Sequence, residues 1–246
     1  MGYLLILAST PQEIDLLASQ LKERKAFSLG EKQAYQGNSF NYKIQLLITG
    51  IGAVNAAQAL TASIYYQRPD LVWLIGCGGA YPESGLEIGG FALASEEIWA
   101  EAGAYTEEGW KSLNEINLPY LIKNDRYFYN CFPMDERLNN LLAKSILSLL
   151  PNANLKIGHF LTVNTTTGDF QRLYILRQHF LGICENMEGA AVAQVCTIYG
   201  IPCLELRCIS NIVGTYDKKN WEITLAAKKC QKLVSNLLER GSDWWV

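Results

Sequence analysis

Three polar side chains stand at points in the sequence where they could act on a bound molecule: the carboxylates of Glu13 and Glu188 and the amide of Asn211. A carboxylate can serve as a general base or bind hydroxyl groups, and an amide can both donate and accept hydrogen bonds. Each residue also has a structural interpretation. Glu13 completes a capping box with Thr10, Glu188 is a carboxylate near a helix start, and Asn211 follows a strand, where turn asparagines are common.

The segment Gly50-Ile51-Gly52 follows an apolar run and opens a helix, as a dinucleotide-binding fingerprint does. The third glycine position of that fingerprint is occupied by Asn55 here, and Asp70 precedes the next strand. A ribose-binding acid should follow that strand. The sequence therefore argues against NAD binding.

A second glycine cluster, Gly76-Cys77-Gly78-Gly79-Ala80, comes directly after the apolar run 71–75. Small residues at the carboxyl end of a buried strand let a ligand lie directly against the backbone. A tight turn would require the same residues, so both interpretations stay open.

Apolar runs alternate with helical patterns along the chain. Strands are expected at 3–8, 42–48, 71–75, 91–98, 155–163 and 203–209, and helices at 11–25, 53–66, 136–150, 169–180, 187–199 and 219–240. Residues 99–133 break the pattern and are interpreted as an excursion, a lid or an interface. The alternation predicts one α/β domain over 1–246 with a mixed or mostly parallel sheet.

The polar residues and glycine clusters share one position: they lie at the carboxyl ends of predicted strands or at the adjacent helix starts. Open α/β sheets bind ligands at that edge. The residues by themselves predict a small-molecule site and nothing more specific.

Composition excludes several classes of function. The 246 residues carry a net charge of −3, with no run of basic residues, which argues against nucleic-acid and membrane binding. Seven scattered cysteines and two histidines offer no zinc spacing and indicate reduced thiols. The apolar start, MGYLLILA, is too short for a signal or membrane segment. We expect a cytoplasmic protein without a metal.

Taken together, these segments resemble the nucleoside phosphorylase superfamily, and within it the branch of methylthioadenosine/adenosylhomocysteine nucleosidases and futalosine hydrolases. The matching pieces are residues 8–17, Gly50-Ile51-Gly52, the 76–80 loop, residues 186–193 and residues 207–211. The resemblance implies a three-layer sandwich with a mixed central sheet flanked by helices. Residues 78–82 and 94–98, and Ile209-Ser210-Asn211 followed by Gly214 and Trp221, favour the futalosine hydrolases, which serve a bacterial menaquinone route.

The resemblance implies hydrolysis of the N-glycosidic bond of futalosine, with release of hypoxanthine and no cofactor. By resemblance Glu13 activates the attacking water, and Arg207 orients the water and the Glu13 carboxylate. Glu188 accepts hydrogen bonds from the ribose hydroxyls, and Met187 packs against the sugar. Residues 8–17 contain none of the arginines that hold phosphate in phosphorylases. A small-molecule nucleoside and water are the expected partners, in a homodimer.

The remaining substrate-binding residues are carried over with departures from the family pattern. Asn211 stands where adenine-releasing nucleosidases have Asp, and its amide can donate to the O6 of hypoxanthine while accepting from a protonated N7. Ser210 is expected to orient that amide. Cys77, Gly78, Gly79 and Asn186 are also expected to bind the substrate, although Cys77 replaces a serine of the family and Asn186 replaces a carboxylate. Phe170 is expected to stack on the base.

Two other functions stay open at this level. One is a nucleosidase for another purine nucleoside, such as methylthioadenosine, adenosylhomocysteine or inosine. The other is a non-catalytic nucleoside-binding protein on the same fold. Lys111, Lys123 or Arg126 in the excursion are candidates to meet the benzoate of futalosine, and Trp244-Trp245 are expected in an interface or in core packing.

Overall fold

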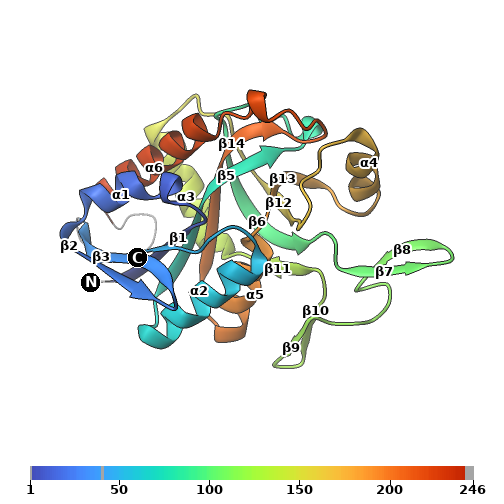
Figure 1. Ribbon diagram of the computed structural model, residues 1–246, viewed down its shortest axis with the longest axis horizontal. Helices are drawn as coiled ribbons and strands as arrows, with labels where there is room; N and C mark the ends of the chain where they lie inside the picture. Colours follow the sequence, from blue (N-terminus) through green and yellow to red (C-terminus); the bar gives the residue numbers. More distant parts are fainter. Residues whose placement is uncertain (1, 40–41, 242–246) are drawn as a thin grey trace.

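The protein is built around a ten-stranded sheet whose strands follow the order β11-β6-β12-β13-β5-β1-β4-β3-β2, with β14 paired to both β5 and β6 (Figure 1). The computed structural model describes residues 2–39 and 42–241, so the Trp244-Trp245 tail lies outside the described residues. The strands are β1 (Tyr3–Ala8), β2 (Lys22–Leu29), β3 (Lys32–Ser39), β4 (Tyr42–Ile48), β5 (Leu71–Ala80), β6 (Phe91–Trp99), β11 (Cys131–Pro133), β12 (Leu155–Thr162), β13 (Gly182–Asn186) and β14 (Cys203–Ile212).

Strand pairing makes the sheet mixed and partly closed. β1 runs parallel to β4 and β5, and β14 runs parallel to β5 but antiparallel to β6. Because β6 also pairs with β12, and β12 with β13, which pairs with β5, these five strands form a ring. The predicted mixed α/β architecture with flanking helices is confirmed.

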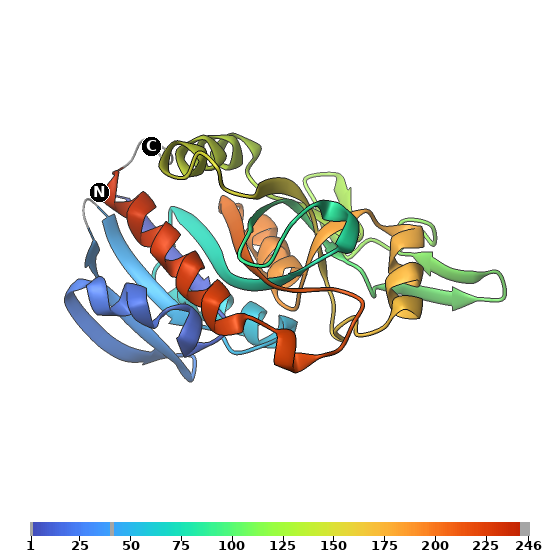
Figure 2. The same ribbon diagram turned by 90° about the horizontal axis from the view of Figure 1, so that it is seen from above.

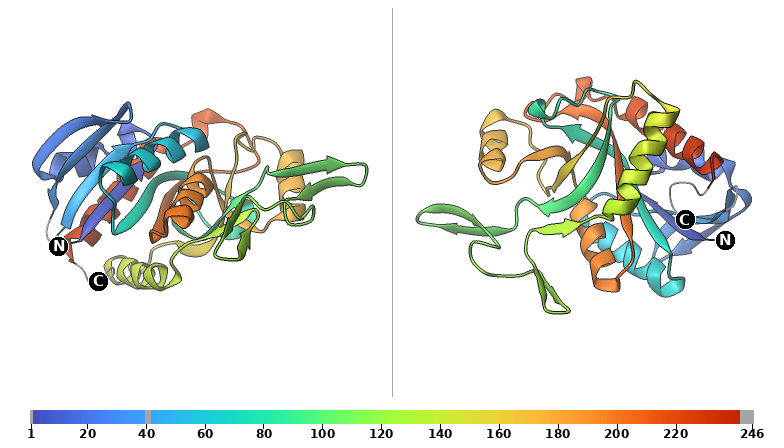
Figure 3. Two further views of the ribbon diagram at one scale, coloured as in Figure 1. Left: turned by 90° about the horizontal axis from the view of Figure 1, so that it is seen from below. Right: turned by 180° about the vertical axis from the view of Figure 1, so that it is seen from behind.

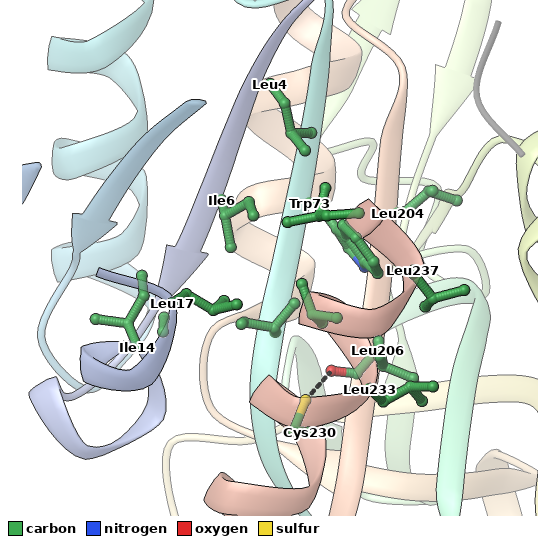
Figure 4. Close-up of a cluster of buried hydrophobic side chains, with 14 of the residues drawn as sticks. Leu4, Ile6, Ile14, Leu17, Trp73, Leu204, Leu206, Cys230, Leu233 and Leu237 are labelled. Atoms are coloured by element: carbon green, nitrogen blue, oxygen red, sulfur yellow. Dashed lines mark hydrogen bonds between the residues drawn. The ribbon is translucent and has the colours of Figure 1, made fainter. Parts of the chain in front are cut away.

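Helices cover both faces of the sheet. Side chains of β1 alternate between the two faces, and because they are apolar on both, each face must be covered. Leu4 and Ile6 pack against α1 (Asp15–Gln20), α3 (Glu136–Leu149) and α6 (Ile223–Glu239), as Figure 4 shows for Leu17, Leu233 and other side chains. Leu5 and Leu7 pack on the face of α2 (Ala53–Tyr66) and α5 (Gly189–Tyr199), which lie side by side in Figure 3. The 3-10 turns are η1 (Pro11–Glu13), η2 (Pro82–Ser84) and η3 (Lys218–Asn220).

The predicted helix over 11–25 is wrong beyond residue 20. The chain leaves α1 and enters β2, which forms an antiparallel hairpin with β3 across Gly30 and Glu31. Both of these residues have positive φ, 56° and 64°, as the tight hairpin turns that match strand twist require. Pairing with β3 therefore overrides the helical spacing of the local sequence.

The excursion over 99–133 contains two small hairpins before β11 rejoins the sheet edge. These are β7 (Gly103–Thr106) with β8 (Gly109–Ser112), and β9 (Leu121–Lys123) with β10 (Arg126–Phe128). The β7–β8 hairpin projects from the body near α4 (Phe170–His179), as Figures 1 and 2 show, whereas β9 contacts α5. Among the described residues no helix is long and apolar enough to cross a membrane.

Candidate active site

A cavity of about 340 Å³ opens at the carboxyl ends of β5 and β14, beside η1 and the start of α5. Sites for small molecules occupy about 300–1,000 Å³. Every residue predicted for the site except Phe170 lines this cavity. The described residues that line it are Ser9, Thr10, Gln12, Glu13, Ile51, Cys77, Gly78, Gly79, Thr166, Glu185, Asn186, Met187, Glu188, Arg207, Ser210, Asn211, Trp221 and Ile223.

Glu13 is both a helix cap and a member of the cavity wall. Its Oε2 accepts hydrogen bonds from the backbone N–H of Thr10, at 3.0 Å, and from the Thr10 hydroxyl, at 2.9 Å. Its Oε1 accepts from the backbone N–H of Cys77, at 2.9 Å. The two interpretations of this residue are therefore compatible, since the capping bonds fix a carboxylate that faces the cavity.

A missing side chain on β5 brings Glu13 close to Arg207. A Cβ at Gly76 would lie 2.6 Å from Glu13 Oε1 and 3.0 Å from Arg207 Nη1. No larger residue fits there, so glycine lets the carboxylate and the guanidinium approach each other over the bare strand.

Among the described residues that line the cavity, Arg207 is the one basic residue, and it is only 2% exposed. Its Nε donates to Glu205 Oε1 at 2.8 Å, its Nη1 to the Cys77 carbonyl at 3.1 Å, and its Nη2 to Glu188 Oε2 at 3.3 Å. Burial lowers the pKa of a guanidinium, but the Glu205 and Glu188 carboxylates outweigh this effect and raise the pKa of Arg207 above its usual range. The guanidinium stays charged and holds three groups in place.

Glu188 reaches the cavity from the N-terminus of α5. Its second oxygen, Oε1, accepts the backbone N–H of Gly52 at 2.8 Å. Gly52 has φ of +95°, a conformation that favours glycine. The Gly50-Ile51-Gly52 turn therefore presents an N–H to a carboxylate of the site, which accounts for the glycines without a dinucleotide.

Asn186 orients the loop that carries Glu188. Its Oδ1 accepts the backbone N–H groups of Glu188, at 2.9 Å, and of Gly189, at 2.7 Å, while its Nδ2 donates to Glu97 Oε1 at 2.5 Å. These bonds assign the amide unambiguously and engage both of its polar atoms. From the sequence, Asn186 is expected to bind the substrate. Asn186 does line the cavity, but the hydrogen bonds of its amide position Glu188.

Behind this loop two carboxyl groups, Glu97 and Glu205, are completely buried. Glu97 Oε1 and Glu205 Oε2 stand 2.0 and 2.5 Å from the point where a Cβ of Gly189 would be, so the two groups are neighbours. Burial and the adjacent Glu205 raise the pKa of Glu97 well above its usual value. Two carboxylates so close cannot both ionise, and a proton on Glu97 also supplies a donor to Glu205 Oε2, which otherwise has no partner among the described residues.

We expect Glu97→Gln to become more stable than the parent as the pH rises. A raised pKa means that folded Glu97 binds a proton that the unfolded chain loses above its ordinary pKa, so the parent loses stability from there upward while Gln does not. The difference in unfolding free energy should grow by up to about 1.4 kcal/mol per pH unit. Thermal unfolding of both proteins between pH 5 and 8 measures it, and a pH-independent difference would contradict the shared proton.

Asn211 follows a bulge in β14. The register between β14 and β5 shifts between Ile209 and Asn211, which leaves Ser210 as the extra residue and turns Asn211 over Gly79. The Ser210 hydroxyl lies 2.8 Å from Asn211 Oδ1 and 3.2 Å from the Gly78 carbonyl. With Oδ1 accepting from Ser210, the Asn211 Nδ2 is the donor available to a ligand.

Cys77 lies in the cavity as a neutral thiol. Burial, followed by the neighbouring Glu13 carboxylate, raises the pKa of this thiol far above its usual value. A neutral thiol is a weak hydrogen-bond donor and a poor nucleophile. The charged groups that line the cavity at this end of β5 are therefore Glu13 and Arg207.

A model of the family described as "Phosphorylase superfamily" matches residues 3–240. The chain belongs to the phosphorylase superfamily. It is 33% identical to the futalosine hydrolase of Thermus thermophilus over 229 residues, which cover 91% of this chain and 94% of that protein. It is 27% identical to the 5'-methylthioadenosine/S-adenosylhomocysteine nucleosidase of Staphylococcus haemolyticus over 239 residues, or 95% and 98% of the two chains.

Solved structures show the same fold. The 5'-methylthioadenosine/S-adenosylhomocysteine nucleosidase from Neisseria meningitidis, in complex with methylthio-immucillin-A, superposes with a TM-score of 0.84 at 21% identity. The match covers 98% of this chain and 100% of that chain. This member of the phosphorylase superfamily therefore has the same fold as that nucleosidase, with helices on both faces of the central sheet.

Phe170 is the one residue predicted for the site that does not line the cavity. It opens α4 and is 69% exposed. Asp169 caps that helix by accepting the backbone N–H of Arg172, which turns the first residue of the helix outward. The assignment of Phe170 to the base is not supported by its position, and Thr166 supplies this loop's lining instead.

Residues 99–133 contribute nothing to the cavity lining of the chain. Lys123 donates to the Thr197 and Ile198 carbonyls at 2.6 and 3.0 Å and so covers the end of α5, and Lys111 pairs with Glu108. Arg126 lies over the Phe128 ring. Each of these cations has a local contact and none lines the cavity, so a contact of one of them with a substrate carboxylate stays a prediction.

Proposed function

We propose that this chain hydrolyses the N-glycosidic bond of futalosine, releasing hypoxanthine and dehypoxanthinyl futalosine without a cofactor. The observation that carries the proposal is an asparagine, Asn211, held by Ser210 beside a cavity that contains Glu13, Glu188 and Arg207. The 33% identity to a futalosine hydrolase over 91% of the chain supports the same substrate. This reaction places the protein in menaquinone biosynthesis.

Glu13 is the group that activates water in this proposal. Breaking a ribosyl–purine bond passes through an oxocarbenium-like transition state, which a water must attack as the base departs. Glu13 is held by three hydrogen bonds, so its carboxylate has little freedom to turn away from the cavity. The nearby Arg207 guanidinium orients the carboxylate and stabilises its charge.

Glu188 binds the ribose hydroxyls. A carboxylate has about four acceptor positions, and the Gly52 N–H and Arg207 Nη2 use one on each oxygen. The remaining positions are available to the 2'- and 3'-hydroxyl groups, with Met187 beside the sugar. Because hydrogen bonds to the sugar strengthen as positive charge develops on the ring, the same residue also favours the transition state.

Asn211 selects and assists the leaving base. Nδ2 donates to the O6 of hypoxanthine, and Oδ1 accepts from N7 once that nitrogen is protonated. A 6-aminopurine has an amino group where hypoxanthine has O6, so its N–H donor would face the N–H donor of Asn211 Nδ2. A site of this kind rejects the wrong partner because a buried polar group is left unpaired.

A nucleosidase for methylthioadenosine or adenosylhomocysteine is the second candidate. Matches to such enzymes at 25–27% identity over most of the chain favour it. Phosphate-free incubation with futalosine, methylthioadenosine and inosine, followed by chromatography of the released bases, separates the candidates. We expect hypoxanthine from futalosine. Adenine from methylthioadenosine would instead support the second candidate, and silence on all three substrates would favour a nucleoside-binding protein.

Assembly and location complete the proposal. We infer a homodimer, supported by large apolar side chains that the two projecting hairpins expose, namely Tyr105, Ile122 and Tyr127. A cytoplasmic location is supported by seven free cysteines, which oxidising compartments tend to pair. Sedimentation velocity tests the assembly, and a monomer at micromolar concentration would contradict it.

A further inference from the structure

One buried carboxylate in the cavity wall has no part in the proposed reaction. Glu185 is 6% exposed and lines the cavity. Its Oε1 accepts the backbone N–H of Thr167 at 2.9 Å, and its Oε2 accepts the Tyr81 hydroxyl at 3.1 Å. No basic side chain among the described residues forms a salt bridge with it. Burial raises the pKa of this carboxyl group. A buried carboxylate without a cation is costly unless further donors reach it.

Strand pairing places Glu185 opposite Asn211 across the cavity floor. Gly79 on β5 is paired with Glu185 on β13 on one side and with Asn211 on β14 on the other. Neighbouring strands lie about 4.8 Å apart, so the two Cα atoms are separated by roughly 10 Å. Residues in register point to the same face of a sheet, so both side chains rise from either side of Gly79.

Gly79 leaves the floor between them open. A Cβ there would lie 3.1 Å from Asn211 Nδ2 and 2.9 Å from Val213 Cγ2, so a side chain would fill the space beside the amide. A flat ring can lie on the bare backbone with one polar edge toward Asn211 and another toward Glu185. The spacing suits a purine base.

The donor pattern of the base decides which purine fits. Hypoxanthine carries a proton on N1 next to its O6 carbonyl, whereas N1 of adenine is an unprotonated acceptor. An ionised carboxylate only accepts hydrogen bonds. Burial disfavours the ionised form of Glu185, but the hydrogen bonds from Thr167 and Tyr81 favour it. In that form Glu185 attracts the N1–H of a 6-oxopurine and repels the N1 lone pair of a 6-aminopurine.

We propose that Glu185 is a specificity-determining residue that accepts the N1–H of a 6-oxopurine base, opposite Asn211. This inference deepens the proposed function and rests on it for the identity of the base. Tyr81 and Thr167 hold the carboxylate from behind, so that its remaining lone pairs face the ring. Two residues on different strands thus read two adjacent positions of the same base.

The test compares the binding of hypoxanthine and adenine to the full chain by calorimetry. Glu185→Gln replaces an obligate acceptor with a group that can donate to the N1 of adenine. We expect the ratio of hypoxanthine affinity to adenine affinity to fall by roughly 10- to 100-fold. Glu87→Gln is the matched control, because it makes the same change at an exposed carboxylate outside the cavity lining, so its ratio should stay within about 3-fold of the parent.

Two results would overturn the assignment. One is an unchanged ratio in Glu185→Gln, which includes the case of an equal loss of affinity for both bases, as a structural role would produce. The other is equal binding of hypoxanthine and 1-methylhypoxanthine by the unaltered protein, a comparison that needs no variant to fold. Failure to release hypoxanthine from futalosine would overturn the proposed function instead, and it is measured separately by turnover.

Discussion

Glu13→Gln is expected to lower kcat for futalosine hydrolysis by roughly 10²- to 10⁴-fold, the usual contribution of a general base. The amide cannot take a proton from water, yet it keeps nearly the same size in a tightly built corner. Nucleoside affinity should change by only a few fold, because Glu188 and Asn211 bind the ribose and the base. Single-turnover kinetics with a separate binding measurement resolves the two effects.

The capping role of Glu13 requires its own control. The Gln variant places an NH₂ group against one of the backbone donors, so some stability is lost for reasons unrelated to catalysis. Thr10→Val removes the hydroxyl donor to Glu13 but keeps the carboxylate. We expect it to lower the melting temperature while losing less than about 10-fold in kcat. Undiminished turnover by Glu13→Gln would return this residue to a capping role alone.

Asn211→Asp is expected to reduce kcat/KM for hypoxanthine release by about 100-fold or more, because a carboxylate cannot donate to O6. The new negative charge also faces the carbonyl oxygen of the base. The loss should be selective: adenine release from methylthioadenosine, relative to hypoxanthine release, should rise. Parallel kcat/KM measurements with both nucleosides give this ratio directly.

Ser210→Ala provides the companion to that variant. It keeps the amide but removes the hydroxyl that fixes Asn211 Oδ1. A freely turning amide presents the correct edge for part of the time, so the expected loss is about 10-fold or less. If Asn211→Asp hydrolysed futalosine as well as the parent, the hydrogen-bond account of specificity would fail, whatever the result with Ser210→Ala.

Asn211 and Glu185 act at different atoms of the base and from different strands. Their contributions to base selection should therefore be largely additive in a double variant, since Gly79 separates them and they share no hydrogen-bond partner. Arg207, in contrast, contacts both Glu188 and Glu205, so variants at these residues should be strongly non-additive.

The sequence by itself determined much of the framework. The apolar runs 3–8 and 71–75 predict strands covered on both faces, and the capping box at Thr10 predicts where a helical turn begins. Glycine clusters at strand ends predict the edge where the ligand binds. These signals are local, because a strand buried on both faces or a helix cap is written in adjacent residues.

Tertiary structure alone decided the rest. Glu97, Glu185 and Glu205 belong to three strands, β6, β13 and β14, and only pairing between strands distant in sequence brings them together beside the site. Phe170 shows the opposite case, since Thr166 lines the cavity while Phe170, at the start of α4, is exposed outside it. A buried carboxylate looks like any surface glutamate in sequence, because its burial and its shared proton depend on strands distant along the chain.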